Sequence, residues 1–381
     1  MSLVLALPAA MLAALLSSAP AVTQPAVTQP APAPSGRVVT VTDPRITESS
    51  GLAVSPVHPD LVWTVNDSGS EPQLFAVSTR TGRTRAVVRL AGIDVRDVEA
   101  LAAGRDERHR PMIWVGDIGD NRAVRDSVVL RLLREPDQVR SQTAAVHSLR
   151  VRYPRGPADA ETLVWLPDGR LLIVTKALLS ARVYQVPASA VSQVLAGRDV
   201  SIPVVAQQVG TIAQTLATDG SALPDGRFVV RGYESATVYA WHGGASDSAS
   251  DSGSDSGFEP VEPVALPTQQ QGEGITVEAG GGTALVSSEG LRQPLYRVAL
   301  PGPTGSVPTT PVPISPVPTS PGPSGSASQP GSTPTRAGAS SDSAGRQWGA
   351  PALLGGGALA AALALGALAV RGARRRTRRS R

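Results

Sequence analysis

The sequence predicts an all-β fold: a β-propeller of five visible four-stranded repeats (five or six blades), followed by one C-terminal transmembrane helix. One supersecondary unit recurs between residues 48 and 300, and each copy opens with acidic or small polar residues before a short apolar run. Turns rich in Asp and Gly, such as the PDGR segments at 167–170 and 224–227, separate consecutive runs. Short antiparallel strands repeated in this way are typical of propeller blades.

The N-terminal residues predict an exported protein. In residues 1–21 an apolar run is followed by Ala19-Pro20-Ala21, which matches the cleavage pattern of a signal peptide. No Lys or Arg precedes the apolar run, which leaves a buried N-terminal helix as the alternative. Residues 22–36 contain VTQPA twice and predict a Pro-rich tether, because such a composition stays extended and builds no core.

The C-terminal residues predict a membrane anchor. Residues 301–347 are mostly Pro, Ser, Thr and Gly, which is typical of a disordered stalk. Residues 349–370 carry no charge and are long enough to span a bilayer as a helix. Seven Arg follow in the tail at 371–381, which is therefore expected to be cytoplasmic. We expect a single-pass protein of the cell membrane with its N-terminal domain outside.

The charge of the chain reflects this tail. The formal net charge is +4, but without the seven tail arginines the rest of the chain carries −3. The basic balance therefore indicates a membrane stop signal, and we expect no nucleic-acid partner. The sequence has no Cys, which excludes disulfides, thiolate metal sites and a Cys nucleophile.

The β-propeller ectodomain is expected over residues 37–300. It opens with a short alternating strand at 37–42, RVVTVT. The second strand of each repeat is strongly apolar: LVWTV, MIWVG, LLIVT, FVVRG and ALVSS. The third follows a polar loop: LFAVS, VVLRLL, VYQVP, TVYAW and LYRVAL. A fourth is visible in the earlier repeats: RAVVRLAG, HSLRVRY and IPVVAQQV.

The two ends of this domain predict how the ring closes. The last repeat shows three strands before the Pro-rich sequence begins, and the isolated strand at 37–42 can supply its outer strand, leaving no open sheet edge. A sixth, degenerate blade within 177–216 remains an alternative. The low-complexity segment at 243–257 predicts a flexible loop inserted in one blade.

Acidic and polar side chains recur at the start of each repeat and at the end of the next strand. The starting set is Glu48, Asp97, Glu99, Asp159, Glu161, Asp219 and Glu273. The second set is Asn66, Asp67, Asp117, Lys176, Tyr233, Glu234, Ser288 and Glu289. Because equivalent positions of a repeat face the same axis, we expect both sets to converge on one rim.

Carboxylates that share a rim repel each other unless a cation neutralises them, and hard oxygen ligands suit Ca²⁺ or Mg²⁺. The candidate metal ligands are Asp97, Glu99, Asp117, Asp120, Asn121, Asp159, Glu161 and Glu273. The candidate catalytic residues are Glu99, Glu161 and Lys176. Structural capping of strand ends is the alternative for all of these acids.

Other chemistries find no support in the sequence. It contains no G-x-S-x-G elbow, no H-E-x-x-H zinc motif, no P-loop and no dinucleotide fingerprint, so no cofactor other than Ca²⁺ is expected. The recurrent tryptophans are expected to pack between blades, with an aromatic ligand platform as the alternative: Trp63, Trp114, Trp165 and Trp241.

Several segments carry a resemblance: ESSGLAVSP, DVEALA, VGDIGDN, DAETL and QGEGITV. Together they resemble the phytase-like, or esterase-like, β-propeller group of exported bacterial proteins. The resemblance implies a propeller ring and, as in the β-propeller phytases, calcium ions and basic residues that hold phosphate over an acidic rim. This chain departs from that pattern, because Lys176 is its single lysine and Arg231 is the nearest further cation by repeat position.

These observations predict a membrane-anchored extracellular β-propeller that acts as a binding or scaffolding module, with a divalent cation at its acidic rim and an extracellular ligand or protein as its partner. The alternative is a Ca²⁺-dependent phytase-like phosphoester or ester hydrolase. A third hypothesis is that the protein has a purely structural role at the cell surface. The sequence leaves open whether the protein is an enzyme.

Overall fold

The computed structural model describes residues 36–67, 71–242 and 257–302. The expected signal peptide, most of the tether, nearly all of the stalk, the transmembrane helix, the Arg-rich tail and the 243–257 loop (all but its last residue) lie outside the described residues. Among the residues that are described, no helix is long and apolar enough to cross a membrane.

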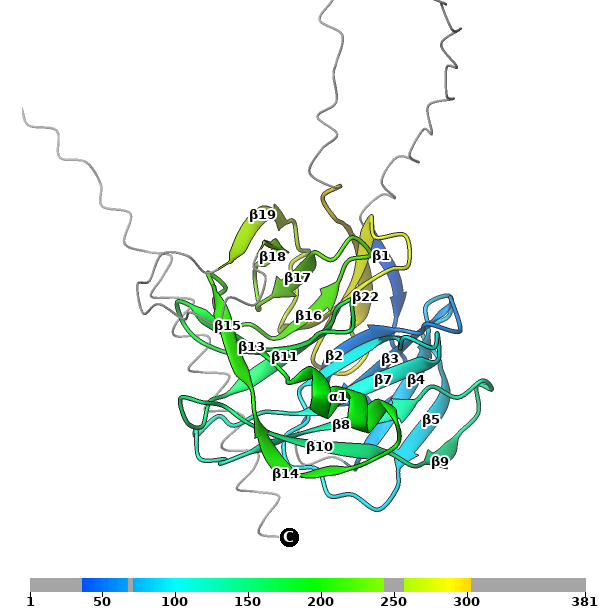
Figure 1. The fold of residues 1–381 in the computed structure, drawn as a ribbon. Helices are drawn as coiled ribbons and strands as arrows, with labels where there is room; N and C mark the ends of the chain where they lie inside the picture. The colour runs from blue at the N-terminus through cyan, green and yellow to red at the C-terminus, as the bar shows by residue number, and fades with distance from the viewer. Residues whose placement is uncertain (1–35, 68–70, 243–256, 303–381) are drawn as a thin grey trace, which may run out of the picture.

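The described residues form five β-sheets arranged as the blades of a propeller (Figure 1). The first blade consists of β2 (Ser49–Val54), β3 (Leu61–Asn66), β4 (Gln73–Ser78), β5 (Thr84–Leu90) and the short β9 (Gln142–Ala144). The second consists of β6 (Ala100–Arg105), β7 (Pro111–Asp117), β8 (Val128–Arg134), β10 (His147–Arg152) and β14 (Val200–Val205).

The other three sheets have four strands each. The third blade consists of β11 (Ala160–Trp165), β12 (Leu171–Thr175), β13 (Ala181–Gln185) and β15 (Gln207–Ile212). The fourth consists of β16 (Asp219–Ala222), β17 (Phe228–Arg231), β18 (Ala236–Trp241) and β19 (Phe258–Val264). The fifth consists of β20 (Gly272–Val277), β21 (Thr283–Ser288), β22 (Pro294–Ala299) and β1 (Gly36–Thr40).

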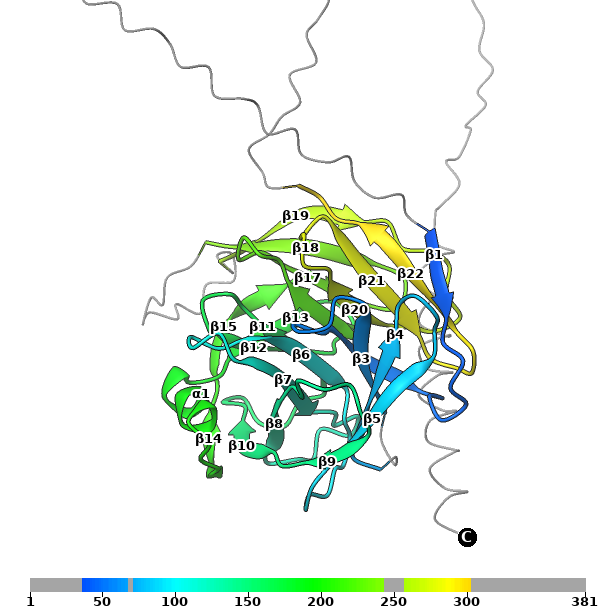
Figure 2. The ribbon, with the colours of Figure 1, turned by 90° about the vertical axis from the view of Figure 1, so that its right-hand side faces the viewer.

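The ring closes as the sequence predicts. Strand β1 pairs antiparallel with β22, so the two ends of the domain share one sheet, and Figure 2 shows β1 (blue) beside β22 (yellow). The inner strand of each blade contacts the inner strand of the next, and β20 contacts β2. All the strands and core clusters that the structure describes therefore lie within residues 36–302.

The segment that was considered for a sixth blade forms no sheet of its own. After β13 the chain forms helix α1 (Ala188–Leu195), and β14 then pairs in parallel with β10 of the second blade. The chain returns as β15, the outer strand of the third blade. The run IPVVAQQV, expected as one strand, is thus two strands in different sheets that separate at Ala206.

The core lies between blades, in five clusters that each join two neighbours. Successive residues of a strand point to opposite faces. In β3, Trp63 packs toward the second blade and Val62 toward the fifth. Because both faces are buried, the second strands read as continuous apolar runs. Trp63, Trp114 and Trp165 pack in these clusters as expected, while Trp241 is half-buried beside Phe258.

The inner strands approach so closely that some positions admit no side chain. A Cβ at Gly51 of β2 would lie 2.3 Å from the backbone nitrogen of Leu101 in β6. Neither backbone can move without disturbing two blades. We therefore expect Gly51→Ala to destabilise the domain by about 1–3 kcal/mol. Gly280→Ala is the matched control, because a Cβ there meets nothing within 4 Å. Equal urea midpoints for the two variants would contradict this packing.

Candidate metal centre

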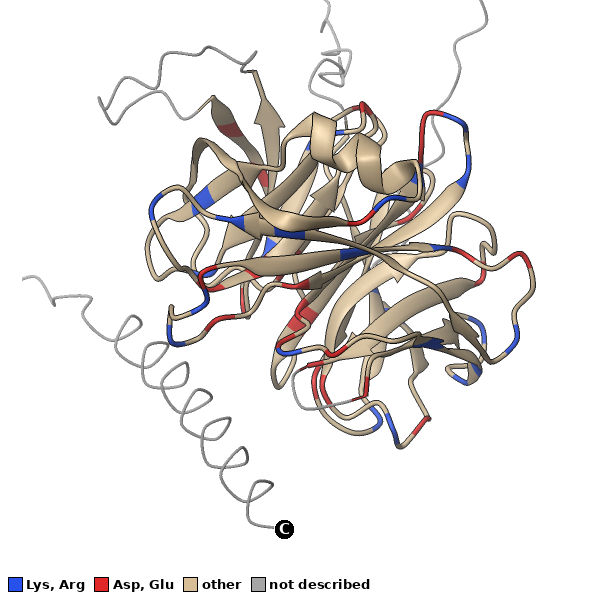
Figure 3. Ribbon diagram, turned by 60° about the horizontal axis from the view of Figure 1, so that its bottom comes forward, with Lys and Arg blue, Asp and Glu red and all other residues tan. Residues whose placement is uncertain are grey.

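Equivalent residues at the start of the five inner strands gather at one end of the central channel. They are Ser50, Glu99, Glu161, Asp219 and Glu273, and each has no exposed surface. In Figure 3 red acidic segments lie near the middle of the ribbon. We call these residues the acidic ring. Glu99, Glu161, Asp219 and Glu273 belong to the starting set expected from the sequence, whereas in the first blade the equivalent position is Ser50 and not the expected Glu48.

Asp219 shows how narrow the ring is. Its Oδ2 accepts hydrogen bonds from the backbone nitrogens of Leu52 in β2, at 3.1 Å, and of Ile275 in β20, at 2.9 Å. Its Oδ1 accepts from the nitrogen of Gly220 at 2.9 Å. Burial nevertheless raises the pKa of Asp219 well above its usual value. Asp219 thus ties three inner strands together across the channel.

Arg231 offsets the charge on this side of the ring. Its guanidinium is wholly buried and donates to the backbone oxygens of Gly232, Gly274, Ser287 and Tyr233. Burial lowers the pKa of Arg231 to about 10, while the charges of Glu273 and Asp219 favour its ionised form. Glu273 also accepts from the Gln271 side chain at 3.2 Å.

Lys176 offsets the negative charge of Glu161 in the third blade. Its Nζ donates to Glu161 Oε2 at 2.6 Å and to the Tyr233 hydroxyl at 2.7 Å, and its side chain is 5% exposed. The same nitrogen lies 4.8 Å from the centre of the Tyr233 ring. A buried ammonium therefore sits among oxygen atoms at the mouth of the channel.

Three carboxylates from the first two blades form the group best suited to a metal ion. Asp67, Asp97 and Glu99 are buried, and one oxygen of each lies within 4.8 Å of the others. The Ser50 hydroxyl donates to Glu99 Oε2 at 3.0 Å, which fixes that side chain. The backbone nitrogen of Asp67 donates to the Glu48 oxygen at 2.9 Å, which places Asp67 directly after β3.

Gly119 in the VGDIGDN segment lies in close contact with this group, where no larger residue fits. A Cβ there would lie 2.7 Å from Asp97 Oδ2 and 2.8 Å from Glu99 Cγ. The Gly119 nitrogen donates to the Asp97 oxygen at 3.1 Å, so the loop lies directly against the two carboxylates. A glycine here leaves the carboxylate oxygens uncovered by any side chain from this position. The donor set and this cradle both fit a divalent cation.

The structure places the other acids of VGDIGDN differently. Asp117 Oδ1 accepts from Arg125 at 3.0 Å and Oδ2 accepts from Arg131 at 3.0 Å, and all three side chains are buried. The backbone nitrogens of Arg96 and Asp97 also donate to Asp117. Its oxygens are thus held by two guanidiniums and two N–H groups, and the structure places Asp117 outside the three-carboxylate group.

Asp120 and Asn121 belong to the loop after β7. Asp120 is buried, and its Oδ2 accepts from the Arg125 nitrogen at 2.7 Å. Asn121 is half-buried, and its Oδ1 has no hydrogen-bond partner among the described residues. Asp120 therefore helps to shape the loop that presents Gly119.

Asp159 lies between the loops of the second and third blades. Its Oδ1 accepts from the Asp120 nitrogen at 2.7 Å, and its backbone oxygen accepts from the Lys176 nitrogen at 2.9 Å. Burial and the charges of Glu161 and Asp97 raise the pKa of Asp159 to about 7, although the Asp120 N–H and Lys176 oppose this. Asp159 thus interacts electrostatically both with Glu161 and Lys176 of its own blade and with Asp97 of the neighbouring blade.

The sequence predicted Glu99, Glu161, Asp219 and Glu273 of the acidic ring, and it predicted Asp97 beside Glu99, but it left Asp67 out of the ligand set. Asp67 stands one residue beyond the end of β3, and its place beside the next blade is set by the ring. Gly119 was not assigned a role at the site, whereas Tyr233 was expected at the rim but not as a partner of Lys176. The repeat position of Asp67, next to the Asp97–Glu99 pair in the neighbouring blade, is the signal that points to it.

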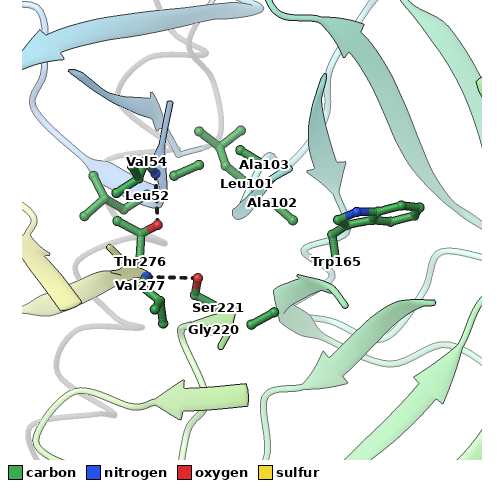
Figure 4. Close-up of a pocket in the computed structure, with 12 residues that line it drawn as sticks. Leu52, Val54, Leu101, Ala102, Ala103, Trp165, Gly220, Ser221, Thr276 and Val277 are labelled. Carbon is green, nitrogen blue, oxygen red and sulfur yellow. Dashed lines mark hydrogen bonds between the residues drawn. The ribbon is translucent and has the colours of Figure 1, made fainter. Parts of the chain in front are cut away.

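The opposite end of the channel holds a small cavity of about 90 Å³. Hydroxyl groups cover the strand edges here, because Thr276 accepts from the Val54 nitrogen and Ser221 from the Val277 nitrogen. Figure 4 shows these two hydroxyls lining the pocket, with Leu52 near Thr276 and Trp165 on the opposite side. The channel is therefore acidic at one end and mainly lined by small and apolar side chains at the other.

Comparison with known protein families and with curated proteins finds no match to this sequence. The structure is similar to the PQQ-bound aldose sugar dehydrogenase from Streptomyces coelicolor, with 10% identity, a TM-score of 0.39, and coverage of 70% of this chain and 98% of that one. It is also similar to a gluconolactonase from Xanthomonas campestris, with 11% identity, a TM-score of 0.38, and coverage of 69% and 89%. Scores this low carry no information about activity, and the resemblance to the phytase-like group stays a prediction.

The contacts of Asp117 predict a structural role. Asp117→Asn would leave two buried guanidiniums without their counter-charge, so we expect a loss of about 3–5 kcal/mol in the free energy of unfolding. Asp60→Asn is the control, since Asp60 pairs with Arg80 at the surface and its loss should cost about 1 kcal/mol or less. Urea unfolding followed by tryptophan fluorescence measures both. Similar values for the two variants would contradict the role.

Proposed function

We propose that this protein is a binding module of the β-propeller class whose channel mouth holds a divalent cation on Asp67, Asp97 and Glu99. The observation that carries the proposal is the approach of three buried carboxylates to within 4.8 Å of one another. Ionised carboxylates this close in a buried site repel each other strongly. A divalent cation that bridges them turns this repulsion into attraction.

The chemistry of the site favours Ca²⁺. All three side chains offer hard oxygen ligands, and Ca²⁺ accepts six to eight such ligands in flexible geometry. Carboxylates that bind through one or both oxygens supply part of this number, and water or a bound ligand supplies the rest. Gly119 lies against Asp97 and Glu99 and adds no side chain that would cover their oxygens. The extracellular ligand would complete the coordination of the cation.

The same proposal includes the location predicted from the sequence. The uncharged run at 349–370 and the seven following arginines support a single membrane span with the propeller outside the cell. The Pro, Ser and Thr composition of 301–347 supports a stalk between the propeller and the membrane. The module would then present its acidic mouth to ligands at the cell surface.

A Ca²⁺-dependent hydrolase is the second candidate, favoured by the groups beside the cation site. Asp159, whose pKa is raised to about 7, lies near Asp97 and has the protonation behaviour of a general base. Lys176 and Tyr233 add a cation and a hydroxyl. A phosphoester or ester held at the mouth would meet all three. This candidate requires that the mouth admit a substrate.

Calcium should stabilise the domain. For a ligand at one hundred times its dissociation constant, binding to the folded state adds about 2.7 kcal/mol, which corresponds to a rise of roughly 5 °C or more in melting temperature. We expect this rise for residues 36–302 when Ca²⁺ replaces EGTA. Glu99→Gln should abolish the rise and melt in EGTA no lower than the unmodified protein, because it removes one repelling charge.

Glu107→Gln is the matched control for that measurement, because Glu107 is exposed at the other end of the inner strands. It should respond to Ca²⁺ like the unmodified protein. A Glu99→Gln variant that melts lower in EGTA, with no effect of Ca²⁺ on the unmodified protein, would contradict the cation site and favour a capping role.

The hydrolase candidate is tested with p-nitrophenyl phosphate and p-nitrophenyl acetate in the presence of Ca²⁺. It predicts turnover that EGTA abolishes and that Asp159→Asn, which removes the general base, lowers by about a hundredfold or more. Glu107→Gln should leave turnover unchanged. If neither compound is turned over by a protein that binds Ca²⁺, the hydrolase candidate loses its support and the binding module remains.

A further inference from the structure

The end of the channel that carries the acidic ring contains a second position lined by oxygen atoms. The ammonium of Lys176 occupies this position. This position is formed by Glu161 Oε2 and the Tyr233 hydroxyl, which lie 2.6 Å and 2.7 Å from Lys176 Nζ. Both distances are short for an N–H···O contact and are typical of a charge-assisted hydrogen bond. The ammonium is almost completely buried.

Asp159 lies within electrostatic reach of this position. Its carboxyl interacts with Glu161 and Lys176 on one side and with Asp97 on the other. The backbone nitrogen of Lys176 donates to the backbone oxygen of Asp159 at 2.9 Å, and this hydrogen bond holds the two residues side by side. Glu161 Oε2 and the Tyr233 hydroxyl therefore hold the ammonium through two short contacts, and the Asp159 carboxyl adds a nearby negative charge.

Lysine is so rare in this chain that its presence between Glu161 and Tyr233 is informative about that position. Lys176 is the single lysine, against 34 arginines among the 35 basic residues. An ammonium is a compact point charge with three donors, whereas a guanidinium is a broad planar fork. The position between Glu161 and Tyr233 is thus occupied by the one cationic side chain that resembles a small ion in size.

We propose that Lys176 is the built-in cation of a second metal-like site, and that its ammonium limits the mouth to one exogenous divalent cation. The inference rests on the proposed cation site at Asp67, Asp97 and Glu99. It adds that Glu161 and Tyr233, with the charge of Asp159 nearby, would bind a second divalent cation if the ammonium were absent. Lys176 is therefore a specificity-determining residue that sets the stoichiometry.

The test uses Lys176→Met, which removes the ammonium and its charge and keeps an unbranched side chain one heavy atom shorter. Residues 36–302 are titrated with Ca²⁺ by isothermal calorimetry, and the bound ion is counted by atomic emission after gel filtration. We expect one Ca²⁺ per chain for the unmodified protein and two for Lys176→Met. In EGTA the variant should melt lower than the unmodified protein, and Ca²⁺ should raise its melting temperature further than that of the unmodified protein.

The double variant Lys176→Met/Glu161→Gln is the matched control. It has the same net charge as the unmodified protein at this position and lacks the carboxylate of the second site, so we expect one Ca²⁺ per chain. Replacing a buried ion pair by neutral groups of similar shape is often tolerated. This variant separates the stoichiometry from a general effect of losing Lys176.

The outcomes distinguish the two proposals. One Ca²⁺ in both the unmodified protein and Lys176→Met would overturn this inference and leave the cation site at Asp67, Asp97 and Glu99 standing. No Ca²⁺ in the unmodified protein and one in Lys176→Met would overturn the first site and support the second. A Lys176→Met variant that fails to fold even in excess Ca²⁺ would also overturn the inference, because the ion is expected to replace the ammonium.

Discussion

The convergence of five inner strands on one narrow channel is the constraint on which the rest of the structure depends. The side chain of Asp219 bonds to strands on both sides of it, which shows how little space the channel leaves. Residues at the first positions of these strands are therefore forced into the same buried volume. Four of the five equivalent positions carry a carboxyl group, so the fold must compensate a concentration of negative charge.

The compensation differs from blade to blade. Asp219 is held by backbone N–H groups, and Arg231 lies next to it and Glu273. Glu161 has the ammonium of Lys176. In the first two blades, Asp67, Asp97 and Glu99 approach one another closely beside a glycine. The carboxylates at equivalent repeat positions are thus stabilised in different ways. Backbone N–H groups, a guanidinium and an ammonium each stabilise one of them, and in our proposal a metal ion stabilises another.

The repeat pattern predicted the ring, its closure and the burial of the second strands, because these depend on local turns and on apolar residues that recur at a fixed period. It did not predict that IPVVAQQV divides between two blades. The pairing of β14 with β10 depends on a crossover through α1, which leaves no periodic signal in the sequence.

The candidate site was predicted in part for the same reason. Glu99, Glu161 and Glu273 occupy equivalent repeat positions, so their convergence follows from the ring alone. Asp67 joins Asp97 only because neighbouring blades meet there, and Asp117 turns away because Arg125 and Arg131 bind it. Such contacts between blades and within loops depend on side-chain positions that spacing along the chain does not encode.

The most direct test of the account is a crystal structure of residues 36–302 grown with Tb³⁺ in place of Ca²⁺, with an anomalous difference map to locate the ion. The account predicts one strong peak bound by oxygens of Asp67, Asp97 and Glu99, at about 2.3–2.6 Å as for Ca²⁺. A map with no peak at the mouth of the channel, or with the ion bound elsewhere, would contradict it.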